Sequence, residues 1–349
     1  MAPDRSEDRL IAWLRSRQES LGAVSPIGDD AALLEVSSDL AVTVDTQVEG
    51  VHFVPGTDPR TLARRLLAVN LSDLAAVGAR PTWGFLVISG PESFDERRFL
   101  DAFLTACEEA GLTLAGGDVG RQSHLTLALT ALGERRRPGR WLRRSDARPG
   151  HRLWLGGSVG EAAVGLHLVQ RGALVAWPDE DPDTVPRVEL PDSLASKPDS
   201  DPLAAAARSA VLRHQLPSAQ LELGAWLAST EEGAAIDVSD GLALDLHRLA
   251  EASGVGIRLH VEALPRAPRF EPLCRGLELD ETDLALGGGE DYVLLFTLPA
   301  DDVPPAHLGA QVIGQVVEAE AGLVAVEGGA ERPLTAKGWD HLSRKTEQN

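Results

Sequence analysis

Apolar strands and amphipathic helices alternate along the N-terminal half of this chain, and this alternation constrains its fold more than any other feature. The apolar runs Leu40–Val44 and Trp83–Ser89 predict strands, and the looser alternation of Leu, Thr and Ala over Leu125–Leu132 predicts a third. Between the first two, Arg60–Val77 carries its larger apolar residues at helical spacing. The N-terminal half is therefore predicted to contain both kinds of element in turn.

A second helix of this half is predicted from the residues at its two ends. Ser93 followed by Glu96 forms a capping box, which predicts a helix start. Gly111 is a typical residue just past a helix end, so the helix is predicted to run to about Ala110.

The length of 349 residues suggests two domains, and the basic, turn-rich stretch Arg135–Arg148 is the predicted boundary. We predict an N-terminal domain at residues 1–147 and a C-terminal α/β domain at residues 148–349. Residues 177–202 are rich in Pro, Asp, Glu and Ser, and they predict a flexible acidic insertion. The other elements predicted in the second half are strands at Arg152–Leu155, Ala234–Val238, Gly256–Val261 and Tyr292–Leu298, and helices after Gly156–Ser158 and at Leu203–His214, Ala219–Ala228 and Leu242–Ala252.

The charge balance excludes several classes of function. The formal net charge is −20, from 53 acidic against 33 basic residues, and such a field repels nucleic acids and anionic membranes. Lysine occurs only at Lys197, Lys337 and Lys345, so the chain has neither a GxxxxGK[ST] phosphate loop nor the lysine motifs of protein kinases. If this chain handles phosphates, it must use metal ions, backbone amides and arginine.

Aspartates recur in five short segments beside predicted strand or helix ends. Mg²⁺ prefers oxygen ligands and completes its shell with water and substrate phosphates, so clustered aspartates suit it. Neighbouring glycines let backbone amides approach a phosphate closely. The segments are Gly28–Asp30, Val44–Thr46, Asn70–Asp73, Gly116–Asp118 and Asp237–Gly241. Together they predict a site for divalent metal ions and phosphate groups.

Several of these residues have a purely structural interpretation as well. Asp29, Asp30 and Asp240 are suited to capping the segment that follows each of them. His52 is equally suited to binding a substrate and to forming hydrogen bonds in the core. The run Gly287–Gly289 is either a flexible turn or a place where the backbone approaches a ligand closely.

Other chemistries find no support in the sequence. Cys107 and Cys274 form neither a disulfide framework nor a CxxC zinc site, and we expect both to be packing residues. The histidines show no HExxH pattern, and no GxSxG segment occurs. No apolar run approaches the roughly 20 residues of a membrane span. The chain begins without a signal peptide, so we expect a cytoplasmic protein.

Six segments together resemble the thiamine-monophosphate kinase family. They occur in the family's order and cover nearly the whole chain, and their combination is far more specific than any one of them. They are IGDDAALLEVSSDLAVTVDTQVEGVHF (27–53), LLAVNLSDLAAVGARPTW (66–83), LAGGDVGR (114–121), IDVSDGLALDL (236–246), ALGGGEDYVLLFTLP (285–299) and KGWDH (337–341).

The resemblance implies an α/β (α+β) fold of two domains, each a mixed sheet packed by helices, with the N-terminal sheets pairing across a homodimer. It also implies Mg²⁺-dependent transfer of the ATP γ-phosphoryl group to thiamine monophosphate, which gives thiamine diphosphate and ADP. The acceptor phosphate oxygen is already anionic near neutral pH. Positioning and charge neutralisation by several Asp-held Mg²⁺ ions would therefore carry the in-line displacement. No nucleic acid or membrane partner is expected.

Residue roles carry over by motif position. The implied Mg²⁺ ligands are Asp30, Thr43, Val44 through its backbone, Asp45, Asp73, Asp118, Asp237 and Asp240. The implied catalytic residues are Asp45, Asp73, Asp118 and Asp237. The implied ATP contacts are Gly117, Asp118, Arg144 and Ser239, and the implied substrate contacts are His52, Glu290 and Trp339, the last by stacking on an aromatic ring.

Two segments depart from the family's pattern. Residues 116–122 are GGDVGRQ where the family commonly has GGDTTRG, which removes hydroxyl groups near the nucleotide. In residues 214–220, Gln220 replaces an arginine. Neither change removes an implied metal carboxylate. Two alternatives stay open: an aminoimidazole ribonucleotide synthetase of the same superfamily, and a non-catalytic binding protein that kept the fold.

Overall fold

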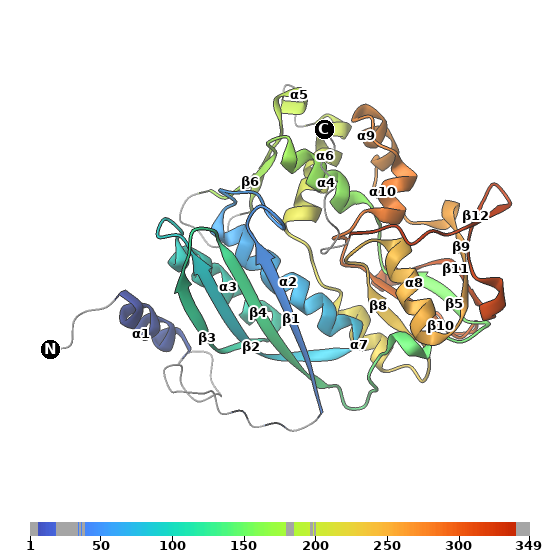
Figure 1. The fold of residues 1–349 in the computed structure, drawn as a ribbon, viewed down its shortest axis with the longest axis horizontal. Helices are drawn as coiled ribbons and strands as arrows, with labels where there is room; N and C mark the ends of the chain where they lie inside the picture. Colours follow the sequence, from blue (N-terminus) through green and yellow to red (C-terminus); the bar gives the residue numbers. More distant parts are fainter. Residues whose placement is uncertain are drawn as a thin grey trace. The chain divides into compact units, whose positions relative to one another are not determined.

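The computed structural model describes residues 6–18, 34, 36, 39–178, 185–195, 198 and 200–339. The chain divides into two compact units, each built around its own sheet (Figure 1). The first unit comprises Met1–Trp141, Gly172–Glu189 and Gln215–Thr230, and the second comprises Leu142–Arg171, Leu190–His214 and Glu231–Asn349. The chain thus passes between the units several times. The domain limits 1–147 and 148–349 stay a prediction.

The first unit contains a four-stranded sheet in the order β1-β4-β2-β3. Strands β1 (Leu40–Val48) and β2 (Ala79–Gly90) run antiparallel to β4 (Thr126–Arg135), and β3 (Thr113–Arg121) runs parallel to β2. Helices α2 (Pro59–Ala76) and α3 (Glu96–Ala110) pack on one face of this sheet, and their apolar residues form one core with it (Figure 1). The unit's other elements are α1 (Ser6–Gln18), β6 (Leu174–Ala176), β7 (Arg187–Glu189) and α7 (Leu221–Ala228).

Helix α3 starts at a different cap from the one that the sequence predicted. The N-cap is Asp95, whose carboxylate accepts the Arg98 amide at 2.9 Å. Just before the cap, Phe94 packs against Phe99 with ring centroids 5.8 Å apart, which fixes the entry of the chain as a hydrophobic staple. The predicted capping box at Ser93 is therefore wrong, because the Phe94 contact brings the next residue to the cap position.

The second unit contains a seven-stranded sheet in the order β13-β12-β9-β11-β5-β10-β8, in which only β9 and β12 pair in parallel. Its strands are β5 (Arg152–Leu155), β8 (Ala235–Asp237), β9 (Gly256–His260), β10 (Leu294–Leu298), β11 (Gln311–Val317), β12 (Leu323–Glu327) and β13 (Ala330–Pro333). Its helices are α4 (Glu161–Gln170), α5 (Asp192–Ala195), α6 (Pro202–Gln215, whose last residue belongs to the first unit), α8 (Leu242–Ser253), α9 (Phe270–Gly276) and α10 (Glu281–Gly287). Among the described helices of the chain, none is both long and apolar enough to cross a membrane.

Part of the acidic stretch 177–202 has regular structure, since β7 pairs antiparallel with β6 and α5 forms a short helix. The stretch begins at Trp177, whose indole Nε1 donates to Thr61 Oγ1 of α2 at 2.8 Å. The guanidinium group of Arg60 lies 5.0 Å from the centroid of the same ring. These contacts attach the start of the stretch to the helical layer of the first unit. The predicted flexibility of the whole stretch stays a prediction.

Both cysteines are buried, as expected for packing residues. Burial raises the pKa of the Cys107 thiol far above its ordinary value and that of Cys274 to about 11. Because the thiolate is the nucleophilic form, neither side chain is a ready nucleophile near neutral pH.

Candidate functional site

In the first unit, predicted metal ligands on β1 and α2 face each other. Thr43 Oγ1 donates to Asp73 Oδ2 at 2.5 Å, and the Asp45 amide donates to Asn70 Oδ1 at 3.2 Å. Thr43 and Asp45 share a face of β1 because alternate strand residues point the same way. Asn70 and Asp73 share a face of α2 because they are three residues apart. The structure therefore brings Thr43, Asp45 and Asp73 together.

Asn70 is a site residue for which no role was predicted from the sequence, although it belongs to the aspartate segment Asn70–Asp73. Its side chain is fully buried, and its Nδ2 donates to the Leu66 carbonyl at 2.8 Å while its Oδ1 accepts the Asp45 amide. A buried amide with both ends engaged fixes the distance between α2 and β1. Its spacing of three residues from Asp73 on a predicted helix is the sequence feature that points to it.

Val44 lies between two of these residues but points the other way. Its side chain is 60% exposed on the face of the sheet opposite to α2. Only its main chain lies between Thr43 and Asp45, so a role in metal binding requires the carbonyl group, as the resemblance implies.

Two of the aspartate segments lie within strands and not at turns. Strand β1 continues past Asp45, which pairs with Leu129 in mid-strand. Strand β3 contains Gly116–Asp118, and Asp118 pairs with Val87 of β2. The prediction that these two segments lie beside strand or helix ends is therefore wrong. Asp and Gly have low β propensity, but pairing with apolar neighbouring strands overrides that preference.

Gly117 has a structural reason to be glycine. A Cβ atom at this position would lie 1.8 Å from the Leu86 carbonyl oxygen, so β3 can lie against β2 only without a side chain there. The neighbouring Asp118 is exposed. The close approach is to the main chain of β2, and the implied ATP contact of Gly117 stays a prediction.

His52 closes the turn that follows β1. Its Nδ1 accepts the Val48 amide at 3.0 Å, and its side chain is half-buried. An Nδ1 atom that accepts carries no proton, so this bond places the proton of a neutral ring on Nε2. His52 therefore has a structural role as a hydrogen-bond acceptor. Its implied contact with the substrate stays a prediction.

In the second unit, three segments far apart in the sequence meet at the turn after β8. Ser239 O accepts the Glu290 amide at 2.7 Å, and Asp240 O accepts the Trp339 amide at 2.9 Å. Asp237, at the end of β8, is buried, and Trp339 is 46% exposed. Four of the predicted site residues, Ser239, Asp240, Glu290 and Trp339, thus belong to one cluster of main-chain contacts, and Asp237 lies two residues before it.

Glycines make these main-chain contacts possible. A Cβ atom on Gly289 would lie 2.6 Å from Ser239 O. Gly241 has φ +128 and a Cβ there would lie 2.9 Å from Gly287 O, so both its conformation and its surroundings exclude a side chain. The close approach predicted for Gly287–Gly289 is therefore to the protein's own main chain.

Asp245 and Arg248 organise this turn, although neither was predicted from the sequence to be a site residue. Asp245 is fully buried, and its Oδ2 accepts the amides of Ser239 and Asp240, each at 3.2 Å. Arg248 Nη1 lies 2.6 Å from Asp245 Oδ1 and 2.7 Å from Asp240 Oδ2. Burial raises the pKa of Asp245, and the hydrogen bond from Arg248 opposes that shift. The spacing of three residues within an amphipathic helix is the sequence feature that points to this pair.

Arg144 lies on a short 3₁₀ turn, Arg144–Asp146, of the second unit. The hydroxyl of Ser253 at the end of α8 donates to the Arg144 carbonyl at 2.6 Å and accepts the Ala147 amide at 3.1 Å. The turn is thus fixed by its main chain, and the Arg144 side chain is exposed.

The oxygen donors of the first unit fit Mg²⁺. Mg²⁺ in phosphate-transferring sites is usually held by one or two carboxylates and completed by water and substrate phosphates. Asp45 and Asp73, with the Thr43 hydroxyl, supply such a set on one face of β1 and α2. Among the described residues, no group of three or more His, Cys, Asp or Glu side chains is arranged to hold a metal ion. Asp30 lies outside the described residues.

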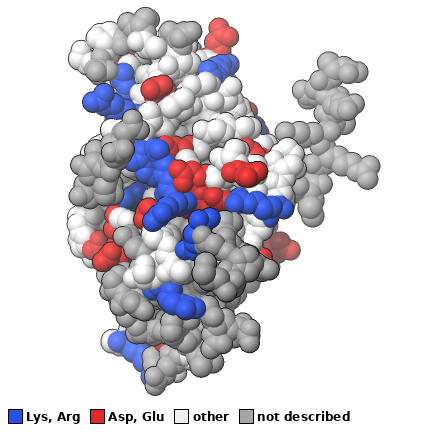
Figure 2. Space-filling model, turned by 90° about the vertical axis from the view of Figure 1, so that its left-hand side faces the viewer, with Lys and Arg blue, Asp and Glu red and all other residues white. Residues whose placement is uncertain are grey.

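Acidic and basic side chains are mixed on one face of the molecule. Figure 2 shows a face on which Lys and Arg side chains gather among Asp and Glu side chains. Two partly exposed ion pairs of the first unit are Arg64–Glu109 at 3.0 Å and Arg98–Asp58 at 2.8 Å. Pairs of this kind contribute little to stability singly. On this face, basic charge is interrupted by acidic side chains.

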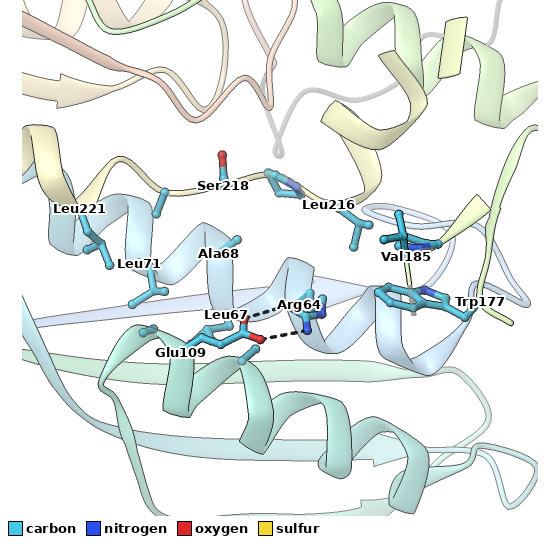
Figure 3. Close-up of a pocket in the computed structure, with 15 residues that line it drawn as sticks. Arg64, Leu67, Ala68, Leu71, Glu109, Trp177, Val185, Leu216, Ser218 and Leu221 are labelled. Atoms are coloured by element: carbon cyan, nitrogen blue, oxygen red, sulfur yellow. Dashed lines mark hydrogen bonds and ion pairs between the residues drawn. The ribbon is translucent and has the colours of Figure 1, made fainter. Parts of the chain in front are cut away.

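The first unit also contains a cavity of about 580 Å³ between α2, α3 and the chain before α7. Leu67 and Leu71 line its floor, the Arg64–Glu109 pair lies along one side, and Trp177 stands at one end (Figure 3). Among the described residues, none of the predicted site residues lines this cavity. It is therefore separate from the carboxylates of β1 and α2.

Comparison with known proteins agrees with the sequence motifs. The N-terminal domain model of the AIR synthase related proteins matches residues 28–135, and the C-terminal domain model matches residues 148–326. Thiamine-monophosphate kinase from Salmonella typhimurium is 36% identical over 342 residues, which cover 94% of this chain and 95% of that protein.

Solved structures agree as well. The crystal structure of thiamine-monophosphate kinase from Stenotrophomonas maltophilia K279a is similar with a TM-score of 0.75 and 34% identity, over 93% of this chain and 98% of that one. The structure of AaThiL complexed with AMPPCP and TMP is similar with a TM-score of 0.72 and 28% identity, over 98% of this chain and all of that one. The predicted fold, two α/β domains with helix-packed mixed sheets, is confirmed. The chain belongs to the AIR synthase related family and, within it, to the thiamine-monophosphate kinases.

Proposed function

We propose that this chain is a Mg²⁺-dependent kinase that transfers the γ-phosphoryl group of ATP to thiamine monophosphate, giving thiamine diphosphate and ADP. Relatives named for that activity resemble the chain over nearly its full length, and a similar solved structure is complexed with AMPPCP and TMP. Within this chain, two hydrogen bonds carry the proposal, one from Thr43 to Asp73 and one from the Asp45 amide to Asn70. They join β1 to α2 where each element supplies one carboxylate.

Mg²⁺ is the proposed metal because every proposed ligand offers oxygen. When bound, Mg²⁺ neutralises phosphate charge and aligns the two reacting groups. Asp240 is paired with Arg248 through Oδ2, so a metal ion would bind its Oδ1 or displace the guanidinium group. The proposed ligands are Asp30, Thr43, the Val44 carbonyl, Asp45, Asp73, Asp118, Asp237 and Asp240.

The remaining roles follow the chemistry of the two substrates. A phosphate acceptor is anionic near neutral pH and needs no strong base. The proposed catalytic contribution of Asp45, Asp73, Asp118 and Asp237 is therefore to keep the reacting groups, and the charge that stabilises them, in position. The proposed ATP contacts are Gly117, Asp118, Arg144 and Ser239, and the proposed contacts to thiamine monophosphate are His52, Glu290 and Trp339. Because the reaction consumes ATP, we propose that it takes place in the cytoplasm.

We also propose that the active form is a homodimer joined through the first unit's sheet. The face opposite to α2 exposes Val42 at 61%, Val44 at 60% and Val87 at 36%. The register places Val44, Thr130 and Phe85 in one row across β1, β4 and β2. A sheet face whose apolar side chains are exposed to solvent in a single chain is suited to burial against a second copy related by a two-fold axis.

The experiment that tests the function is an assay with purified protein, ATP and Mg²⁺. Thiamine monophosphate, thiamine and formylglycinamidine ribonucleotide are offered separately, and products are separated by chromatography. We expect thiamine diphosphate from the monophosphate alone and no product with Asp73→Asn or Asp45→Asn. Turnover of the purine precursor instead would assign the chain to the synthetases of the superfamily. Binding of thiamine monophosphate without any turnover would identify a non-catalytic binding protein.

A further inference from the structure

The segment Glu290–Tyr292 of the second unit has a strained main chain. Glu290 has φ +67 and Tyr292 has φ +49, a region that residues other than glycine rarely adopt. Strain of this kind persists only where surrounding contacts hold it, and it is concentrated at ligand-binding and catalytic positions. The contacts that hold this segment therefore indicate which of its side chains is held in a defined position.

The main chain of the segment is fixed against the turn after β8. The Glu290 amide donates to Ser239 O at 2.7 Å, and the Tyr292 amide donates to Val238 O at 2.8 Å. These two bonds run along one edge of the segment. They set the direction of the Glu290 side chain at its Cα atom, but they leave the carboxylate itself to be placed by other groups.

Asp291, between the two strained residues, points into the protein. Its carboxylate accepts the Gly160 amide at 2.7 Å and the Ala162 amide at 3.2 Å, at the start of α4, and no part of the residue is exposed. Arg213 Nη2 donates to the Asp291 carbonyl at 2.6 Å. The middle residue is thus an anchor, held from α4 on one side and from α6 on the other.

His214, next to Arg213 on α6, lies within ion-pairing distance of the Glu290 carboxylate. His214 Nδ1 lies 2.9 Å from Glu290 Oε2, and the His214 side chain is only 4% exposed. The Glu290 side chain is 23% exposed, so its carboxylate lies between a buried imidazole and solvent. Neighbouring residues of one helix thus hold neighbouring residues of the strained segment, Arg213 by the main chain and His214 by the carboxylate.

We propose that His214 is a positioning residue that orients the Glu290 carboxylate for thiamine monophosphate. The proposal rests on the proposed function, in which Glu290 contacts that substrate. A carboxylate whose Oε2 lies 2.9 Å from a buried imidazole nitrogen is restricted in orientation. It can accept from N–H donors of a ligand and face its positive charge. Thiamine carries both an amino-substituted ring and a cationic ring, so the orientation of one carboxylate affects recognition of the acceptor and not of ATP.

The test compares steady-state kinetics of His214→Ala, His214→Gln and a matched control, His247→Gln. His247 is a half-buried histidine of the same unit whose Nε2 lies 2.7 Å from Leu334 O. We expect His214→Ala to raise the KM for thiamine monophosphate about tenfold, with kcat and the KM for ATP nearly unchanged. His214→Gln retains a donor and is expected to restore part of the loss. The control is expected to match the wild type in all three parameters.

A double-mutant cycle separates positioning from a structural role. In a Glu290→Gln background, His214→Ala is expected to add no further rise in the KM, because the group it orients has already been altered. A purely structural histidine would instead give additive effects, and each His214 variant would show a lowered Tm together with changes in kcat. Either result would overturn the proposal.

Titration calorimetry with thiamine monophosphate keeps this proposal distinct from the proposed function. Binding and turnover by the wild type with an unchanged affinity in His214→Ala would refute the positioning role alone. Neither binding nor turnover by the wild type would refute the proposed function and, with it, the role of His214.

Discussion

Thr43 and Thr46 lie on opposite faces of β1, and among the described residues only Thr43 of the two bonds to a proposed metal ligand. We expect Thr43→Val to raise the Mg²⁺ concentration for half-maximal activity about tenfold, because groups that orient metal ligands typically change metal affinity by that much. Thr46→Val makes the same chemical change on the exposed face, and it serves as the control. The measurement is activity against Mg²⁺ concentration, with Mn²⁺ binding followed by electron paramagnetic resonance.

Equal Mg²⁺ dependence in the two valine variants would argue that Asp73 is not a metal ligand. A loss of thermal stability confined to Thr43→Val, without a change in metal dependence, would assign the Thr43–Asp73 bond to the packing of α2 on β1.

Asp291 gives a prediction for the pH dependence of stability. Burial is the main cause that raises its pKa from 3.8 to about 7, although the Gly160 amide and Arg213 lower it. Between these two values the folded protein binds more protons than the unfolded chain, so this group makes stability fall as the pH rises from about 4 to 7. Asp291→Asn removes the titration, and it keeps an acceptor for one of the two amides.

The measurement for Asp291 is the free energy of unfolding of both proteins by urea at several pH values. The difference between wild type and Asp291→Asn is expected to shift in favour of the variant from pH 4 to 7 and to level off above pH 7. A difference that stays constant over this range would show that Asp291 is ionised throughout.

At the scale of elements, the parallel pairing of β3 with β2 depends on one glycine. A Cβ atom at Gly117 would meet the Leu86 carbonyl oxygen at 1.8 Å, and a main-chain atom cannot rotate away as a side chain can. Gly120 of the same strand faces only the end of the Ser89 side chain, 2.9 Å from an added Cβ. The two glycines therefore make a matched pair.

We expect Gly117→Ala to destabilise the protein by about 3 kcal/mol or more, and Gly120→Ala to have an effect below about 1 kcal/mol. Chemical denaturation of both variants and the wild type measures this directly. Equal stability of the two variants would contradict the close approach of β3 to β2. If Gly117→Ala folds and only its KM for ATP rises, the glycine serves the nucleotide and not the sheet.

At the scale of the whole molecule, the exposed sheet face of the first unit is the proposed dimer contact. Val42 and Val303 are each 61% exposed, but only Val42 lies on that face. We expect Val42→Glu to convert a dimer to a monomer, because a buried unpaired charge strongly opposes association. Val303→Glu is expected to remain dimeric. Light scattering after size-exclusion chromatography measures both masses, and two dimeric variants, or a monomeric wild type, would refute the proposed interface.

Local sequence patterns determined most of the helices and strands of this protein. The helical spacing over Arg60–Val77 predicts α2, and the run Trp83–Ser89 predicts the centre of β2. The motifs were sufficient to predict the family and the two-domain fold, because the resemblance extends over nearly the whole chain. The helices, the strands and the family can be predicted because they depend on periodicity and residue order, which can be seen directly in a sequence.

Other features were decided only when distant residues met in space. Asp45 and Asp118 lie in mid-strand because pairing with neighbouring strands outweighs their weak β propensity. No local pattern links Glu290 with His214 or Asp291 with the start of α4, since the partners are far apart in the sequence. The sequence therefore determined which positions are occupied by aspartate or glycine. Which of them face each other was decided by tertiary packing, because hydrogen bonds and steric exclusion act between atoms that are close in space.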